Sequence, residues 1–91
     1  MTAHKIVVLS TTSPILLSPP GTHSGVDITM QNVNASGYVY IGASDVSTSS
    51  YGYKLYPGQG ITVELSAFSR LYAVSSNGGM TTALLVIERA V

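Results

Sequence analysis

Residues 25–41, GVDITMQNVNASGYVYI, decide the fold class because apolar and polar side chains alternate along them. Val26, Ile28 and Met30 are separated by single polar residues, which is the period-2 pattern of a β-strand with one buried face. The turn-forming run NASG then leads into YVYI, which places two tyrosines on one face and two aliphatic residues on the other. The segment therefore predicts two strands joined by a turn.

Further short apolar runs lie on both sides of this segment, and no run has the period of an amphipathic helix. We therefore expect an all-β single domain over residues 1–91, built as one antiparallel β-sandwich or small barrel of about seven to eight short strands. The small, hydroxyl-rich segment 42–52 is expected to be a long exposed loop. The other expected strands are 5–10, 15–17, 53–56, 61–65, 71–74 and 81–87.

Two dipeptides predict turns of defined geometry. Pro57-Gly58 suits the centre of a type II turn, because proline fixes φ and glycine accepts a positive φ. Asn77-Gly78 lies between two apolar runs and predicts a type I′ hairpin, in which both central residues have positive φ. Gly58→Val and Asn77→Val are therefore expected to destabilise the protein.

The chain carries unusually few charges. Charged residues make up 9% of its 91 residues, against about 25% in an average soluble domain, and the formal net charge is zero. Polarity comes instead from 13 serines and nine threonines. Such a surface has too few cations for nucleic acid or an anionic membrane, whereas near-zero net charge favours association. We find no signal peptide, no apolar run of the roughly 20 residues that span a bilayer, and no cysteine for a disulfide.

The first and last predicted strands, at 5–10 and 81–87, are apolar on both faces. A chain of this length builds only a thin core. A second covered face is explained either by burial within the domain or by contact with another subunit, and the sequence leaves both explanations open.

Residues suited to chemistry are sparse. His4 and His23 have no partner at metal-ligand spacing, and no serine lies in a nucleophile elbow. The Asn34-Ala35-Ser36 sequon is interpreted as part of a turn. We therefore predict no catalytic residue, no metal site and no cofactor.

Six of the seven aromatic residues are tyrosines, which suit the edge of a core, a protein contact or a sugar platform. Tyr51 and Tyr53 flank Gly52 at the mouth of the long loop.

Residues 1–25 are interpreted either as a docking arm or as the first strands. The predicted partner-binding residues are His4, Lys5, Ile6, Tyr38, Tyr40, Tyr51, Tyr53 and Tyr56.

Part of the chain resembles a known family. The runs in question are GYVYIGASDV at 37–46, GYKL at 52–55, PG at 57–58, LYA at 71–73 and LVIE at 85–88. Together they resemble a pattern that recurs in small structural proteins of tailed bacteriophages, over residues 26–88. Residues 1–25 have no clear counterpart in that pattern.

The resemblance implies a non-enzymatic virion component, most similar to the capsid decoration (cement) proteins. These commonly bind the major capsid protein as homotrimers on the capsid surface, after synthesis in the host cytoplasm. A surface poor in charge suits such contacts, because few ions must be desolvated. The alternative is a receptor- or glycan-binding module of a phage tail, baseplate or head fibre.

Overall fold

The computed structural model describes residues 2–18, 25–67 and 69–88. These residues form eight β-strands in two antiparallel sheets, so the predicted β-sandwich is confirmed and a closed barrel is not formed. The proline-rich loop and His23 lie outside the described residues. In the described part of the chain, no helix is long and apolar enough to cross a membrane.

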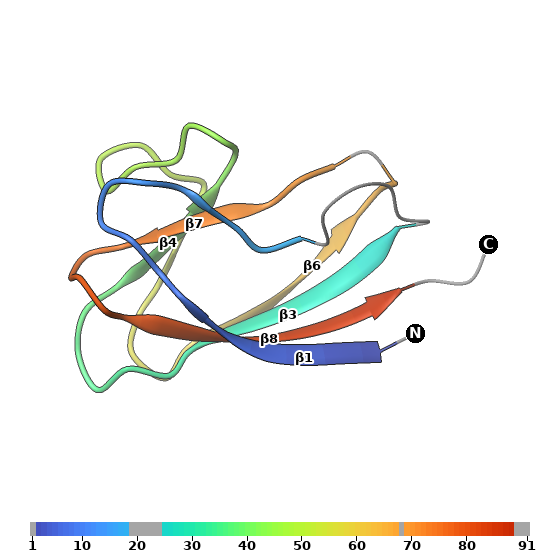
Figure 1. The fold of residues 1–91 in the computed structure, drawn as a ribbon, viewed down its shortest axis with the longest axis horizontal. Coiled ribbons are helices and arrows are strands. Elements are labelled where there is room, and N and C mark those ends of the chain that lie inside the picture. Colours follow the sequence, from blue (N-terminus) through green and yellow to red (C-terminus); the bar gives the residue numbers. More distant parts are fainter. Residues whose placement is uncertain (1, 19–24, 68, 89–91) are drawn as a thin grey trace.

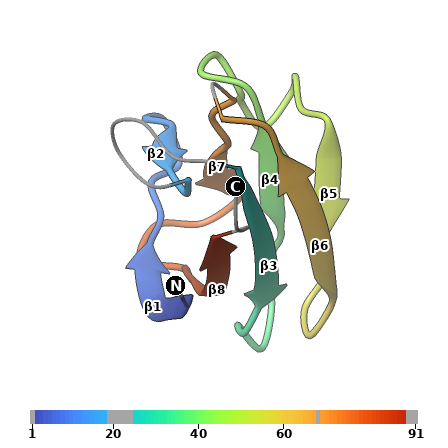
Figure 2. The ribbon, with the colours of Figure 1, turned by 90° about the vertical axis from the view of Figure 1, so that its right-hand side faces the viewer.

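Each sheet has four strands, which Figures 1 and 2 show from two sides. We call them sheet A and sheet B and give their strands in spatial order. Sheet A consists of β1 (Thr2–Val8), β8 (Thr81–Glu88), β3 (Val26–Asn32) and β6 (Gly60–Leu65). Sheet B consists of β2 (Ile15–Leu16), β7 (Tyr72–Ser75), β4 (Val39–Gly42) and β5 (Tyr53–Leu55).

The strand pairing is nested along the chain. β1 pairs with β8, β2 with β7, β3 with β6 and β4 with β5. The pairs β3–β8 and β4–β7 then join these four ladders into the two sheets. This is the strand order of a jelly roll, in which one long hairpin is rolled over itself. Only β4 and β5 are both consecutive in the chain and adjacent in a sheet, so every other connection crosses between sheets.

The core lies between the sheets. The predicted alternation in β3 is confirmed, because Val26, Ile28 and Met30 all point inward and are almost fully buried. They meet inward side chains of sheet B such as Val39 and Leu55, which belong to the same apolar cluster. The aliphatic face of the predicted YVYI strand is therefore the inner face of β4.

The outer face of β1 and β8 bears on the two explanations that the sequence left open for their second apolar face. Ile6 is 61% exposed and Val8 63%, and on β8 Leu85 is 38% and Ile87 43% exposed. The sandwich has only two layers, so each sheet has one inner face, and the outer face of sheet A carries no further layer. Burial within the domain therefore does not explain these apolar residues.

The two predicted turns had different outcomes. Gly58 has a φ of 81°, and the Gln59 amide donates to the Tyr56 carbonyl at 2.9 Å, which confirms the type II turn. The type I′ hairpin at Asn77-Gly78 is wrong, because neither residue has a positive φ and the segment leads from sheet B to sheet A. The positive φ belongs to Gly79 instead, so the reason for strain in Asn77→Val disappears.

A buried asparagine holds the crossing from β3 to β4. The Asn32 side chain is fully buried, and its Nδ2 donates to the carbonyls of Gly37 and Leu55, both at 3.1 Å. Its Oδ1 accepts from the Asn34 amide at 3.1 Å and from the Asn34 Nδ2 at 2.7 Å. Asn34 in turn bonds both the amide and the carbonyl of Thr81. The predicted turn at 34–37 is therefore tied to both sheets by two side chains.

We expect Asn32→Ala to lower the free energy of unfolding by about 2–4 kcal/mol, because it leaves several buried backbone groups without partners. Chemical denaturation measures this change. Asn77→Ala is the control, since Asn77 is exposed, and we expect it to change stability by less than about 0.5 kcal/mol. Equal losses in the two variants would show that the Asn32 bonds do not stabilise the crossing.

Gly58→Ala and Gly78→Ala form a second matched pair. A Cβ would meet nothing within 4 Å at either position, and only Gly58 has a positive φ. We expect Gly58→Ala to cost about 1 kcal/mol and Gly78→Ala to be neutral or slightly stabilising. Thermal denaturation of both variants tests this, and a Gly78→Ala loss as large as that of Gly58→Ala would contradict the described turn.

Candidate contact surfaces

The predicted partner-binding residues fall into two groups on opposite sides of the sandwich. His4, Lys5 and Ile6 belong to β1 in sheet A, and the tyrosines belong to sheet B and the segments next to its strands. Residues 2–18 carry β1 and β2, one edge strand of each sheet, so this stretch runs through both layers. Because one group belongs to sheet A and the other to sheet B, the two groups form separate candidate surfaces.

The first surface, the β1–β8 face, consists of Ile6, Val8, Leu85 and Ile87. All four point outward from sheet A, because Ile6 is in register with Ala83 and Leu85 with His4. Ile6 and Leu85 are diagonal neighbours across the ladder, whereas Val8 lies opposite Thr81 and Ile87 opposite Thr2. Groups of exposed apolar residues mark interaction sites. Sequence reasoning singled out only Ile6, although the apolar residues on both faces of the last strand were a usable signal for Leu85 and Ile87.

The other half of the same sheet face is polar. Asp27, Thr29, Thr62 and Glu64 point outward from β3 and β6, and the hydroxyls of Thr29 and Thr62 lie 2.9 Å apart. These strands alternate between inward apolar and outward polar residues, as expected of a sheet face in water. Among the strand residues of sheet A, the exposed large apolar side chains thus belong to β1 and β8.

The second surface, the tyrosine–lysine cluster, consists of Tyr38, Tyr40, Tyr51, Tyr56 and Lys54. The Lys54 Nζ lies 4.1 Å from the ring centroid of Tyr38, 5.2 Å from that of Tyr56 and 5.9 Å from that of Tyr40. Tyr38 and Tyr56 meet edge to face with centroids 5.2 Å apart. Tyr40 and Tyr51 are tilted against each other at 4.7 Å. The five side chains form one connected group on the outer face of sheet B.

A small apolar cluster supports these tyrosines. Tyr40, Val46 and Val74 are buried together outside the main core, and Tyr38 and Tyr72 pack against them. Val46 comes from the segment expected to be an exposed loop, which instead folds back over sheet B and buries this one side chain. Most of the loop is exposed as predicted. Its fixed position explains why Tyr51 reaches Tyr40.

Tyr53 lies apart from the other tyrosines. It is in register with the core residue Ile41, so it points to the inner side of β5, at the open edge of the sheet. Lys54, the next residue, points to the outer side in register with Tyr40. Sequence reasoning missed Lys54 as a surface residue, because only the β4–β5 register brings it to the tyrosines.

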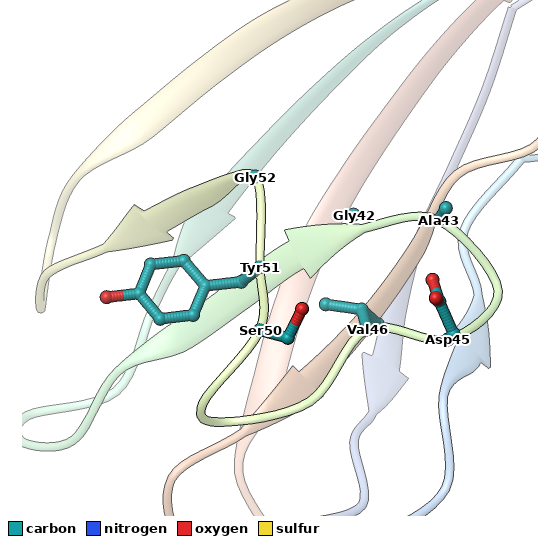
Figure 3. A pocket seen from close by; sticks show the side chains of 7 residues that line it. All are labelled: Gly42, Ala43, Asp45, Val46, Ser50, Tyr51 and Gly52. Atoms are coloured by element: carbon teal, nitrogen blue, oxygen red, sulfur yellow. The ribbon is translucent and has the colours of Figure 1, made fainter.

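A shallow pocket of about 210 Å³ lies within the folded-back loop, between Gly42, Asp45, Ser50 and Tyr51. Figure 3 shows that the Tyr51 ring points away from Asp45 and Ser50. A sugar platform needs an aromatic face beside hydrogen-bonding groups, and here the ring packs on Tyr40 instead. The pocket therefore has polar groups without a stacking surface.

The described residues hold no group of three or more His, Asp or Glu side chains that could bind a metal. The sequon residue Asn34 uses its side-chain nitrogen in two hydrogen bonds, which agrees with its interpretation as part of a turn. No family model, curated protein or solved structure matches the chain. Function must therefore be argued from the two contact surfaces and from the sequence resemblance.

Tyr40→Ala and Tyr51→Ala compare the contributions of a buried and an exposed tyrosine to the stability of the fold. Tyr40 is 8% exposed and Tyr51 45%, so we expect losses of about 3 kcal/mol and at most about 1 kcal/mol in the free energy of unfolding. Urea denaturation of both variants measures the difference. Similar losses would mean that the outer cluster of sheet B does not support the fold in the way described.

Proposed function

We propose that this protein is a non-enzymatic virion structural protein that binds the outside of a phage capsid lattice and stabilises it. The observation that carries the proposal is the β1–β8 face, where the apolar residues Ile6, Val8, Leu85 and Ile87 stay exposed. The second support is the resemblance of residues 26–88 to small phage structural proteins.

The physical reasoning starts from the weak charge of the chain. Four basic and four acidic residues in 91 give little long-range attraction to any partner. Affinity must then come from apolar and aromatic contact, and both contact surfaces offer this. Many copies on a symmetric lattice need only modest affinity each, because neighbouring contacts add as avidity. A small domain with a contact surface on each side suits the bridging of neighbouring subunits.

The proposed partner is the major capsid protein of the same virus, and the proposed location is the capsid surface. The family resemblance favours a homotrimer on the particle. A trimer would also cover apolar surface that one copy leaves exposed, as small domains often require.

A glycan-binding role in a tail, baseplate or head fibre is the second candidate. The exposed rings of Tyr51 and Tyr56 favour it, because tyrosine rings stack on sugars. The orientation of Tyr51 away from the polar pocket weighs against it. Specific hits on a glycan array that are lost in Tyr51→Ala would favour this role over capsid binding.

The experiment for capsid binding is co-sedimentation of the purified protein with undecorated capsids. We expect the wild type to sediment with the particles, and the double variant Ile6→Thr with Ile87→Thr to bind at least about tenfold more weakly, since the centre of an apolar contact is lost. Threonine keeps the preference for a strand, so the fold is retained.

Thr62→Ser is the control, because Thr62 is exposed on β6 in the polar half of the same sheet and serine keeps the hydroxyl that lies beside Thr29. It should bind like the wild type. Failure of the wild type to sediment with capsids would overturn the proposed function. Equal binding by the double variant and the control would remove the β1–β8 face from it.

A further inference from the structure

We propose that the tyrosine–lysine cluster is a docking site for a protein surface that presents a carboxylate between aliphatic side chains. The inference rests on the proposed function for the identity of the partner, and on the geometry of sheet B for the chemistry. Lys54 would then bind the partner from sheet B, on a surface separate from the β1–β8 face.

The position of Lys54 is fixed by aromatic rings. It points outward from β5, and its ammonium lies over the ring of Tyr38 and within reach of Tyr56 and Tyr40. The attraction between a cation and the negative face of an aromatic ring restrains a side chain that is otherwise flexible. When a partner binds this ammonium, the Lys54 side chain therefore loses less conformational entropy than an unrestrained surface lysine would lose.

The cluster carries one positive charge and no negative one. Its members have ring and cation–ring contacts, but no ion pair joins Lys54 to a carboxylate within the described residues. No tyrosine hydroxyl of the cluster forms a hydrogen bond within that part of the chain either. The Lys54 ammonium therefore has aromatic neighbours but no counter-charge within the described residues. The complementary partner group is a strong acceptor with negative charge, which is a carboxylate.

The surroundings of Lys54 decide between classes of partner. Nucleic acid and anionic membranes require several cations, and this cluster has one. A neutral sugar can stack on the exposed parts of Tyr51 and Tyr56, but it leaves the charge of Lys54 without a counter-charge. Aliphatic side chains fit the remaining ring surfaces. Tyrosines around a cation are also typical of a protein-interface hot spot.

The direct test uses the full chain and two capped peptides, Ac-Val-Glu-Val-NH₂ and Ac-Val-Gln-Val-NH₂, titrated at millimolar concentration by NMR. We expect the Glu peptide to shift the side-chain resonances of Lys54 and the ring resonances of Tyr38 and Tyr56. The Gln peptide should shift them several-fold less. Lys54→Arg should keep the response, because it keeps the charge and the contact with the rings.

Two variants make the test specific. Lys54→Gln should abolish the difference between the peptides, and Lys5→Gln should not change it, because Lys5 lies on β1 in the other sheet. The inference is overturned by equal responses to the two peptides, by the absence of shifts, or by loss of the difference in Lys5→Gln. Shifts with neutral sugars but not with the Glu peptide would overturn it in favour of glycan binding.

Capsid co-sedimentation separates this inference from the proposed function. If both hold, Lys54→Gln binds undecorated capsids at least about tenfold more weakly than the wild type, and Lys54→Arg binds normally. Wild-type binding that is unaffected by Lys54→Gln overturns the role of Lys54 in capsid docking and leaves the proposed function intact. Absence of wild-type binding overturns the proposed function, and the peptide titration then decides the chemistry of the cluster alone.

Discussion

The structure depends on one constraint: two layers of short strands can cover only one face of each sheet. The nested pairing of eight strands places all inward residues in a single core and leaves both outer faces without a further layer. All eight strands of the described residues belong to these two layers. The residues on the two outer faces therefore determine which surfaces the protein can use for binding.

The outer faces contain three regions that differ in polarity and in how far the chain itself covers them. The β3–β6 half of sheet A is polar and needs no cover. Sheet B is partly covered by the chain itself, because the loop that carries Val46 folds back and the tyrosines pack around it. The β1–β8 half of sheet A is apolar and stays exposed.

Local patterns predicted the strands well, because alternation over a few residues reports which side faces the core. Val26, Ile28 and Met30 point inward as expected, and the glycine of Pro57-Gly58 has the expected positive φ. Asn77-Gly78 failed because a hairpin requires both flanking strands in one sheet, and here they lie in different sheets. Long-range pairing of this kind leaves no local signature. The position of Lys54 among the tyrosines was missed for the same reason, since it follows from the β4–β5 register.

The central claim is that the β1–β8 face is covered by a partner when the protein is assembled. Hydroxyl-radical footprinting of the free protein and of capsid-bound protein tests it at the level of side chains. We predict that oxidation of Ile6, Leu85 and Ile87 decreases strongly when the protein is bound to the particle, while Glu64, exposed in the polar half of sheet A, is oxidised at the same rate in both states. Oxidation of the β1–β8 face at the same rate in the bound and free states would contradict the claim.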